Sequence, residues 1–151
     1  MDIRAFPGSR RHPHMSREAM ASWIPEADVA YGWEPRLGGR RRPAAESPNL
    51  ALRNLAFRAY ADHMATDEFR AGLTEVLATA ETTRAAVMCA ETLWWRCHRR
   101  LVSDAATLLA GAEVLHVMHD GSLAPHALTD GVRRSGTLLV YDVGAERPLP
   151  L

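Results

Sequence analysis

The chain has 151 residues, of which 47% are hydrophobic and 24% are charged, as expected for one globular domain with its own core. Its 18 basic and 18 acidic residues cancel to a formal net charge of zero, which argues against a protein that coats nucleic acid through its overall charge. No apolar run is long enough to cross a bilayer and no secretory signal opens the chain, so we predict no contact with membranes.

Three elements are predicted near the start of the chain: a strand at residues 2–6, a helix that ends near Glu26, and a strand at residues 28–35. Ser16 is a suitable N-cap for the helix, because its hydroxyl can accept a hydrogen bond from a backbone amide of the first turn. Two loops rich in arginine, glycine and proline are predicted at residues 8–16, before this helix, and at residues 36–49, after the second strand.

The middle of the chain is predicted to be helical over residues 50–82, where apolar side chains recur at helical spacing. Thr66 can cap a second helix, so we expect this stretch to break at residues 65–69. The apolar run at residues 84–91 has a β-branched centre, and it predicts a buried parallel strand.

The next helix is predicted from Trp94 or Trp95 to about Ala110, with Gly111 as its C-cap. Three elements are predicted beyond it: a strand at residues 113–119, a short helix at residues 128–133, and an edge strand at residues 136–143. We expect a single domain over residues 1–143 and a flexible C-terminal tail over residues 144–151.

The alternation of strands and helices predicts an α/β fold, a three-layer domain with a mostly parallel, doubly wound, Rossmann-like sheet. Ligands of such sheets bind outside the carboxyl ends of the strands. Three groups of polar residues are expected at that edge: the loop from Arg10 to His14, the pair Cys89 and Glu91, and residues 119–121.

The stretch "CAETLWWRCHRR" (89–100) is the strongest candidate for a functional site. We expect Cys89 to be a reactive thiol, Glu91 an acid or base, and His98 either its partner or a hydrogen-bond donor to the phosphate. Four arginines are expected to bind the phosphate of a ligand: Arg10, Arg11, Arg96 and Arg99. The structural alternative remains that both cysteines are simply small buried residues.

A metal site is the other alternative for the same stretch. Cys89, Cys97 and His98 could ligate zinc together with a fourth residue such as His12, His14 or Glu91. However, the chain has no Cys-x2-Cys pair, and adjacent residues on a helix point about 100° apart, so we predict no metal site. The sequence identifies no cofactor.

Several motifs match a known family in order: "DIRAFPGSRRHPHMS", "EPRLGGRRR", "MCAETLWWRCHRRLVSD" and "VLHVMHDGSLAPHALT". With them the chain closely resembles the bacterial domain-of-unknown-function family DUF488, from about Asp2 to Tyr141. The resemblance implies a further strand and helix with a "TIGHS"-like motif upstream of Asp2, which the sequence lacks. We expect a misplaced start codon in preference to a true N-terminal truncation.

Taken together, these residues predict an enzyme that processes a phosphate-bearing ligand, a nucleotide or a nucleic acid, at the carboxyl edge of the sheet. Two alternatives stay open: a non-catalytic module that binds nucleic acid or another partner in the same pocket, and the metal-dependent version. Two cysteines without an export signal predict free thiols and a location in the cytoplasm. The sequence does not predict an oligomeric state.

Overall fold

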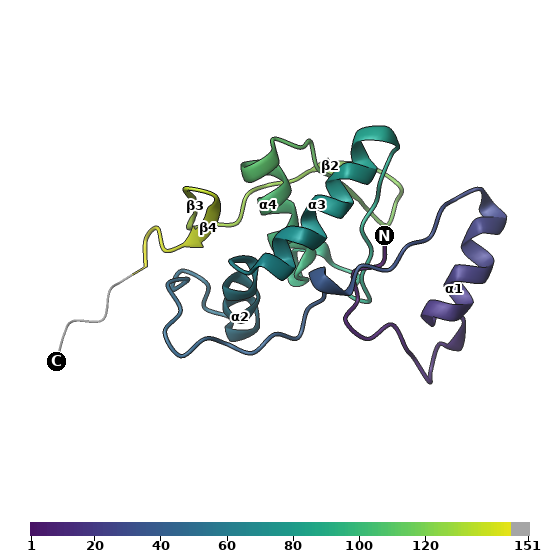
Figure 1. The fold of residues 1–151 in the computed structure, drawn as a ribbon, viewed down its shortest axis with the longest axis horizontal. Coiled ribbons are helices and arrows are strands. Elements are labelled where there is room, and N and C mark those ends of the chain that lie inside the picture. Colours follow the sequence, from purple (N-terminus) through teal and green to yellow (C-terminus); the bar gives the residue numbers. More distant parts are fainter. Residues whose placement is uncertain (146–151) are drawn as a thin grey trace.

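The computed structural model describes residues 1–145 and shows a mixed α/β protein (Figure 1). The helices are α1 (Arg17–Trp23), α2 (Leu55–Met64), α3 (Asp67–Thr82) and α4 (Arg99–Ala110). The strands are β1 (Leu115–Val117), β2 (Leu123–Pro125), β3 (Val132–Ser135) and β4 (Leu138–Tyr141). Short 3-10 turns lie at Pro13–Met15, Ile24–Ala27, Pro35–Leu37 and Trp94–Arg96. Residues 146–151, which make up most of the predicted tail, lie outside the described residues.

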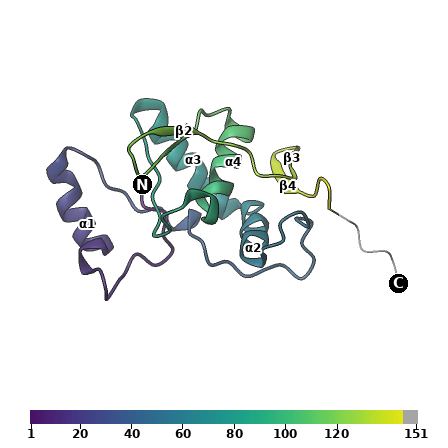
Figure 2. The same cartoon turned by 180° about the vertical axis from the view of Figure 1, so that it is seen from behind.

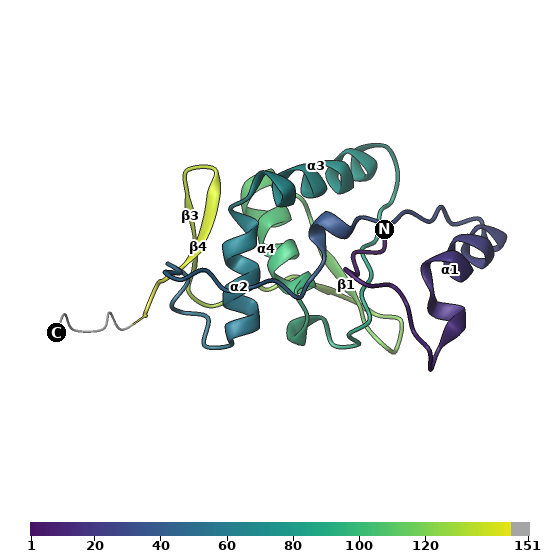
Figure 3. The same cartoon turned by 60° about the horizontal axis from the view of Figure 1, so that its bottom comes forward.

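Helices α2, α3 and α4 form the body of the molecule, with α1 at one end and the β3–β4 hairpin at the other (Figure 1 and Figure 2). The same order is visible when the molecule is tilted (Figure 3). The three central helices share one apolar core with the N-terminal segment and β4; its fully buried members include Ile3, Tyr60, Phe69, Leu101 and Tyr141. None of the helices in the described part of the chain is both long and apolar enough to span a bilayer.

The predicted helix boundaries are confirmed at three caps. The Ser16 side chain accepts a hydrogen bond from the backbone amide of Ala19, and α1 begins directly after it. Thr66 caps α3 in the same way and separates it from α2, as its position in the sequence predicts. Gly111 ends α4 in the left-handed conformation, with φ of 67°.

The strands differ most from the prediction, because both sheets in the described chain are two-stranded and antiparallel. Within residues 1–145, the parallel pairing consists of isolated bridges, in which Asp2 lies between Trp33 and Met88. The three segments predicted as parallel strands therefore run side by side, but the three-layer Rossmann-like sheet is not shown. Residues 84–91, predicted to be a buried strand, are exposed or only partly buried, and Met88 has a bridge partner on one side only within residues 1–145.

The C-terminal elements are antiparallel hairpins. Strand β1, predicted as a parallel strand, turns back after Val117 and pairs with β2. The predicted helix at residues 128–133 is wrong: Val132 begins β3, which pairs with β4. Gly131 and Gly136 flank β3 with φ of 80° and 63°, backbone conformations that glycine adopts readily and that place turns at both ends of the strand.

Candidate functional site

The two cysteines and His98 come together at the start of α4. The Sγ atoms of Cys89 and Cys97 lie 3.9 and 3.6 Å from Nδ1 of His98, and all three atoms lie within 4.8 Å of one another. Nε2 of the same ring lies 3.4 Å from the carbonyl oxygen of Ile3, in the N-terminal segment. Cys89 and His98, from the two sides of the loop at residues 89–98, therefore lie together beside the N-terminal segment at Ile3.

The predicted divergence of Cys97 and His98 is wrong, because the two residues do not share a helix. Cys97 has extended backbone angles, φ −118° and ψ 153°, and α4 begins only at Arg99. The thiol and the imidazole of these neighbours can therefore face each other. Cys97 is buried, whereas Cys89 and His98 are partly accessible.

Two neighbours hold the His98 ring in place. The Tyr60 ring packs against it with a centroid distance of 5.0 Å, and the Tyr60 hydroxyl donates a 2.6 Å hydrogen bond to the carbonyl of Leu37. Gly39 also lies against the ring, because an added Cβ there would come within 2.9 Å of Nδ1 of His98. The paired glycines of "RLGGRRR" thus allow the backbone to approach the site closely.

Gly39→Ala is accordingly expected to displace the His98 ring and to slow the reaction of Cys89 with a thiol reagent. The matched control is Gly8→Ala, because an added Cβ at Gly8 meets nothing within 4 Å. Alkylation rates of the two variants, followed by mass spectrometry at one pH, measure the effect. Equal rates for Gly39→Ala and the unmodified protein would show that the ring does not depend on this contact.

The surroundings of Cys89 favour its thiolate. Hydrogen bonding from the Cys97 thiol lowers the pKa of Cys89 most, and contacts with His98 and the Glu91 backbone amide lower it further, to about 4 despite partial burial. The pKa of Cys97 is raised, first by this pairing with Cys89 and then by burial. One thiolate and one protonated thiol is therefore the favoured charge state of the pair.

A cavity of about 170 Å³ opens beside the cluster. It is lined by Arg4, Ala5, Phe6, Gly39, Arg40, Cys89, Ala90 and His98. The Arg4 guanidinium is occupied by a buried ion pair with Asp2, whereas Arg40 is exposed and lies 5.9 Å from the Phe6 ring. Arg40 is thus the cation best placed to meet an anionic ligand at Cys89.

The predicted phosphate-binding arginines do not gather here. Arg10 and Arg11 are exposed and line neither of the two cavities described for residues 1–145, and Arg96 is also exposed. Arg99 contacts the site, but its guanidinium donates to the backbone carbonyls of Glu91 and Thr92 and to the Cys97 sulfur. Through these hydrogen bonds Arg99 stabilises the loop of residues 89–98, which carries both cysteines.

Glu91 lies at the edge of the site. Its side chain is exposed, and its Oε1 accepts a hydrogen bond from the amide of Leu93 at 3.3 Å. The backbone amide of Glu91 contributes to the low pKa of Cys89, as described above. Among the residues expected to be catalytic, the structure therefore brings together Cys89 and His98 through their side chains and Glu91 through its backbone.

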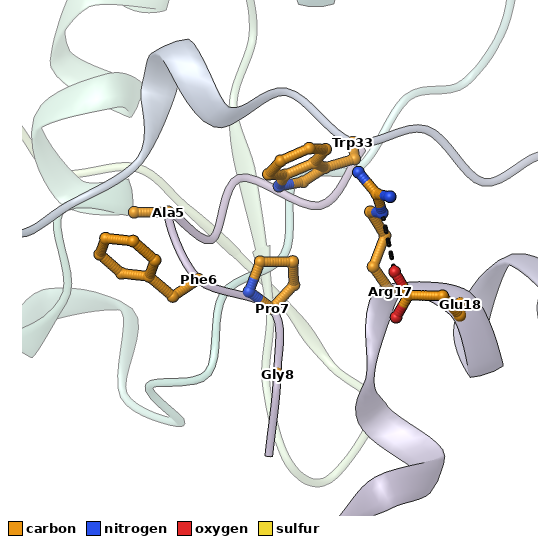
Figure 4. A pocket seen from close by; sticks show the side chains of 7 residues that line it. All are labelled: Ala5, Phe6, Pro7, Gly8, Arg17, Glu18 and Trp33. Atoms are coloured by element: carbon orange, nitrogen blue, oxygen red, sulfur yellow. Dashed lines mark ion pairs between the residues drawn. The ribbon is translucent and has the colours of Figure 1, made fainter.

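A larger cavity of about 380 Å³ lies beside α1, lined by Ala5, Phe6, Pro7, Gly8, Arg17, Glu18 and Trp33 (Figure 4). Its cation is already engaged: the Arg17 guanidinium lies 4.5 Å from the Trp33 ring centroid and forms an ion pair with Glu18. No thiol or imidazole lines it, so the smaller cavity at Cys89 is the better candidate for chemistry.

Sequence reasoning missed two features of the described chain. Arg40 was not among the arginines expected at the site, although its position directly after Gly38 and Gly39 in a predicted loop could have pointed to it. The second is a buried network of Asp104, His126 and His116. The matching motifs contain all three residues, but their spacing does not bring them together, because they come from a helix and from the two sides of a hairpin that was not predicted.

The comparisons with known proteins agree with the resemblance seen in the motifs. A family model described as "Domain of unknown function DUF488" matches residues 1–106, which include the N-terminal segment, α1 to α3, both cysteines and His98. No curated protein and no solved structure matches the chain. Since the match covers well over half of the sequence, the chain belongs to the DUF488 family.

Proposed function

We propose that the protein is an enzyme that uses the Cys89 thiolate on a phosphate-bearing ligand, a nucleotide or part of a nucleic acid. The observation that carries this proposal is the position of Cys89 in the wall of a cavity that also contains His98 and the exposed Arg40. A nucleophile, a group that can exchange a proton with it, and a cation for the ligand thus share one small space.

Each residue has a distinct role in this proposal. Arg40 binds the phosphate through its planar guanidinium, while the Cys89 thiolate forms a bond to an electrophilic atom of the ligand and the bond from that atom to its leaving group breaks. His98, whose Nδ1 lies near both sulfurs, donates a proton to the leaving group and then takes one from the water that cleaves the bond to Cys89 and restores the thiolate. Glu91 holds the Cys89 thiolate through its backbone amide. A reactive thiol of this kind suits the reducing cytoplasm, where we expect the protein.

The test is a screen of nucleotides, nucleosides and short oligonucleotides for chemical change, with Cys89→Ser as the inactive variant. We expect turnover by the unmodified protein and loss of about 100-fold or more in Cys89→Ser, since serine is a far weaker nucleophile at neutral pH. Arg84→Ala serves as the control, because Arg84 is exposed and lines neither of the two described cavities, so its loss should leave turnover unchanged. A turnover that survives Cys89→Ser would rule out the thiol mechanism.

A metal-dependent enzyme is the second candidate, and the spacing of the ligand atoms favours it. Tetrahedral zinc with Zn–S of about 2.3 Å and Zn–N of about 2.0 Å separates a sulfur from a nitrogen ligand by roughly 3.6 Å. The distances of 3.6 and 3.9 Å from His98 Nδ1 to the two sulfurs are close to this value. The Ile3 carbonyl is suitably placed to orient the ring through Nε2.

Elemental analysis of protein purified without chelator separates the two candidates. The thiol enzyme is expected to contain no stoichiometric metal, and its Cys89 should react with alkylating reagents at once. One equivalent of zinc that is lost in His98→Ala, together with slow alkylation that chelator accelerates, would favour the metal-dependent enzyme.

The third candidate, a non-catalytic nucleic-acid module, is favoured only by the exposed Arg10 and Arg11. If these residues bind phosphates, Arg10→Ala should flatten the dependence of log affinity on log salt concentration by about one unit. Fluorescence anisotropy with a labelled single-stranded oligonucleotide measures this slope, and Arg84→Ala, at another exposed arginine, is the control. A slope that Arg10→Ala leaves unchanged would exclude the residue from binding.

We also propose, as the finer description of the fold, that the parallel contacts of Asp2 belong to a doubly wound sheet. The bridges from Asp2 to Trp33 and Met88 support this order of segments. An experimental structure in which these three segments run antiparallel or lie apart would contradict it.

A further inference from the structure

Asp104, His126, His116 and Tyr141 form a buried network of polar side chains that does not line the cavity at Cys89. Asp104 on α4 is fully buried and accepts hydrogen bonds at 2.9 Å from the Tyr141 hydroxyl, the Thr129 amide and Nε2 of His126. Nδ1 of His126 in turn lies 3.0 Å from Nε2 of His116. The carboxylate thus fixes the orientation of both imidazole rings.

The network ends on the loop that carries the candidate site. The His116 ring stacks on the Trp94 ring with a centroid distance of 3.7 Å and an interplanar angle of 4°. Trp94 begins the 3-10 turn that leads to Cys97, and the Cys97 amide donates a hydrogen bond to the Trp94 carbonyl. A displacement of Trp94 would therefore move Cys97 relative to Cys89.

Burial, together with the cationic groups nearby, keeps the His116 ring neutral. Burial lowers its pKa most, and the nearby His126 and Arg99 lower it further, to about 4. The other ionisable groups of the network are Asp104 and the Tyr141 hydroxyl, both buried beyond His126, and the pKa of Tyr141 is raised by burial and by Asp104. A neutral ring that donates from Nε2 to His126 is consistent with this geometry and leaves its face to stack on the indole.

We propose that His116 is a positioning residue, which holds the loop of residues 89–98 in its site geometry through the stack on Trp94. The stack joins two elements that the backbone does not connect directly, the β1–β2 hairpin and the turn before α4. Within residues 1–145, His116 is also the only ring of the network that stacks face to face on Trp94, since His126 meets it edge-on. The effect of this loop on catalysis rests on the proposed function. How well the stack on Trp94 holds the backbone of the loop can be measured without any substrate.

The test is amide hydrogen exchange of peptides that cover residues 89–98, in the full chain. His116→Ala is expected to raise the exchange rate of this segment by about tenfold or more, because the stack that orders it is lost. His116→Phe keeps an aromatic face and should restore slow exchange, although it loses the hydrogen bond to His126. The control is Val117→Ala, since Val117 is the next residue and is 73% exposed.

A second readout follows the site itself. The alkylation rate of Cys89 is expected to fall about tenfold in His116→Ala and to recover in His116→Phe, at a pH and temperature where every variant is folded. If His116→Ala does not fold, Trp94→Leu removes the same stack from the loop side and should give the same two changes.

The outcomes separate this inference from the proposed function. Unchanged exchange of residues 89–98 in both His116→Ala and Trp94→Leu would overturn the positioning role, as would a failure of phenylalanine to restore it. An unreactive Cys89 in the unmodified protein would instead count against the thiol enzyme, while the exchange data would still decide the role of His116.

Discussion

Asp2→Ala is expected to lower the free energy of unfolding by about 3–5 kcal/mol, because it leaves a buried cation without its partner. Asp2 is fully buried, and the Arg4 side chain is 8% exposed. Nε of Arg4 donates to both carboxylate oxygens at 2.8 and 3.0 Å, its NH2 group donates at 2.6 Å, and the Tyr31 hydroxyl adds a 2.7 Å bond. The pair also fixes the segment that bridges Trp33 and Met88.

Urea unfolding followed by tryptophan fluorescence measures this loss, with Glu81→Ala as the control because Glu81 is an exposed acidic residue. A loss of less than about 1 kcal/mol would mean that water or a rearrangement replaces the carboxylate.

The pH dependence of the free energy of unfolding gives a second check. Burial by itself would raise the pKa of Asp2, but hydrogen bonds from Arg4 and Tyr31 lower it overall. The stabilisation by Asp2 is therefore complete above the pKa that Asp2 has in the unfolded chain. It is lost as the pH falls through the lower pKa that Asp2 has in the folded protein.

Cys97→Ala is expected to raise the pKa of Cys89 from about 4 to above about 6, because the Cys97 thiol is the largest cause of the low value. The remaining contacts with His98 and the Glu91 amide should keep the value below that of an ordinary cysteine. The measurement is the midpoint of the alkylation rate against pH, because the midpoint does not depend on the intrinsic nucleophilicity of the thiolate.

Cys97→Ser is the matched variant for this prediction, since its hydroxyl can still donate a hydrogen bond to Cys89. We expect its midpoint to lie between those of the unmodified protein and Cys97→Ala. Equal midpoints in all three proteins would show that the two thiols do not interact in solution.

Three helix limits could be predicted well, because they depend on local chemistry, whereas the predicted helix starts at residue 50 and at Trp94 or Trp95 were too early and the helix at residues 128–133 was wrong. The caps at Ser16, Thr66 and Gly111 act within a few residues of the sequence, and the structure confirms all three. The strands could not be predicted as well, because pairing depends on partners far along the chain. The apolar run at residues 84–91 resembles a buried strand, yet only Met88 pairs, and one side of the segment stays partly exposed.

The candidate site was only partly predictable for the same reason. Cys89, Cys97 and His98 are close in sequence, so one motif could point to all three. Arg40 and the Ile3 carbonyl reach them through tertiary structure, which the motif does not encode. Arg10, Arg11 and Arg96 line neither of the two described cavities, and their places relative to Cys89 likewise depend on tertiary structure that the motif does not encode.

The pH dependence of Cys89 alkylation in metal-free protein tests the central claim most directly, namely that distant segments meet around Cys89 and hold it as a thiolate. Iodoacetamide modification, quantified by peptide mass spectrometry from pH 3 to 10, gives the midpoint for this residue alone. The structure predicts a midpoint near the value of about 4 given by the Cys97 thiol, His98 and the Glu91 amide. A midpoint of about 8 to 9, as for an ordinary exposed cysteine, would contradict it.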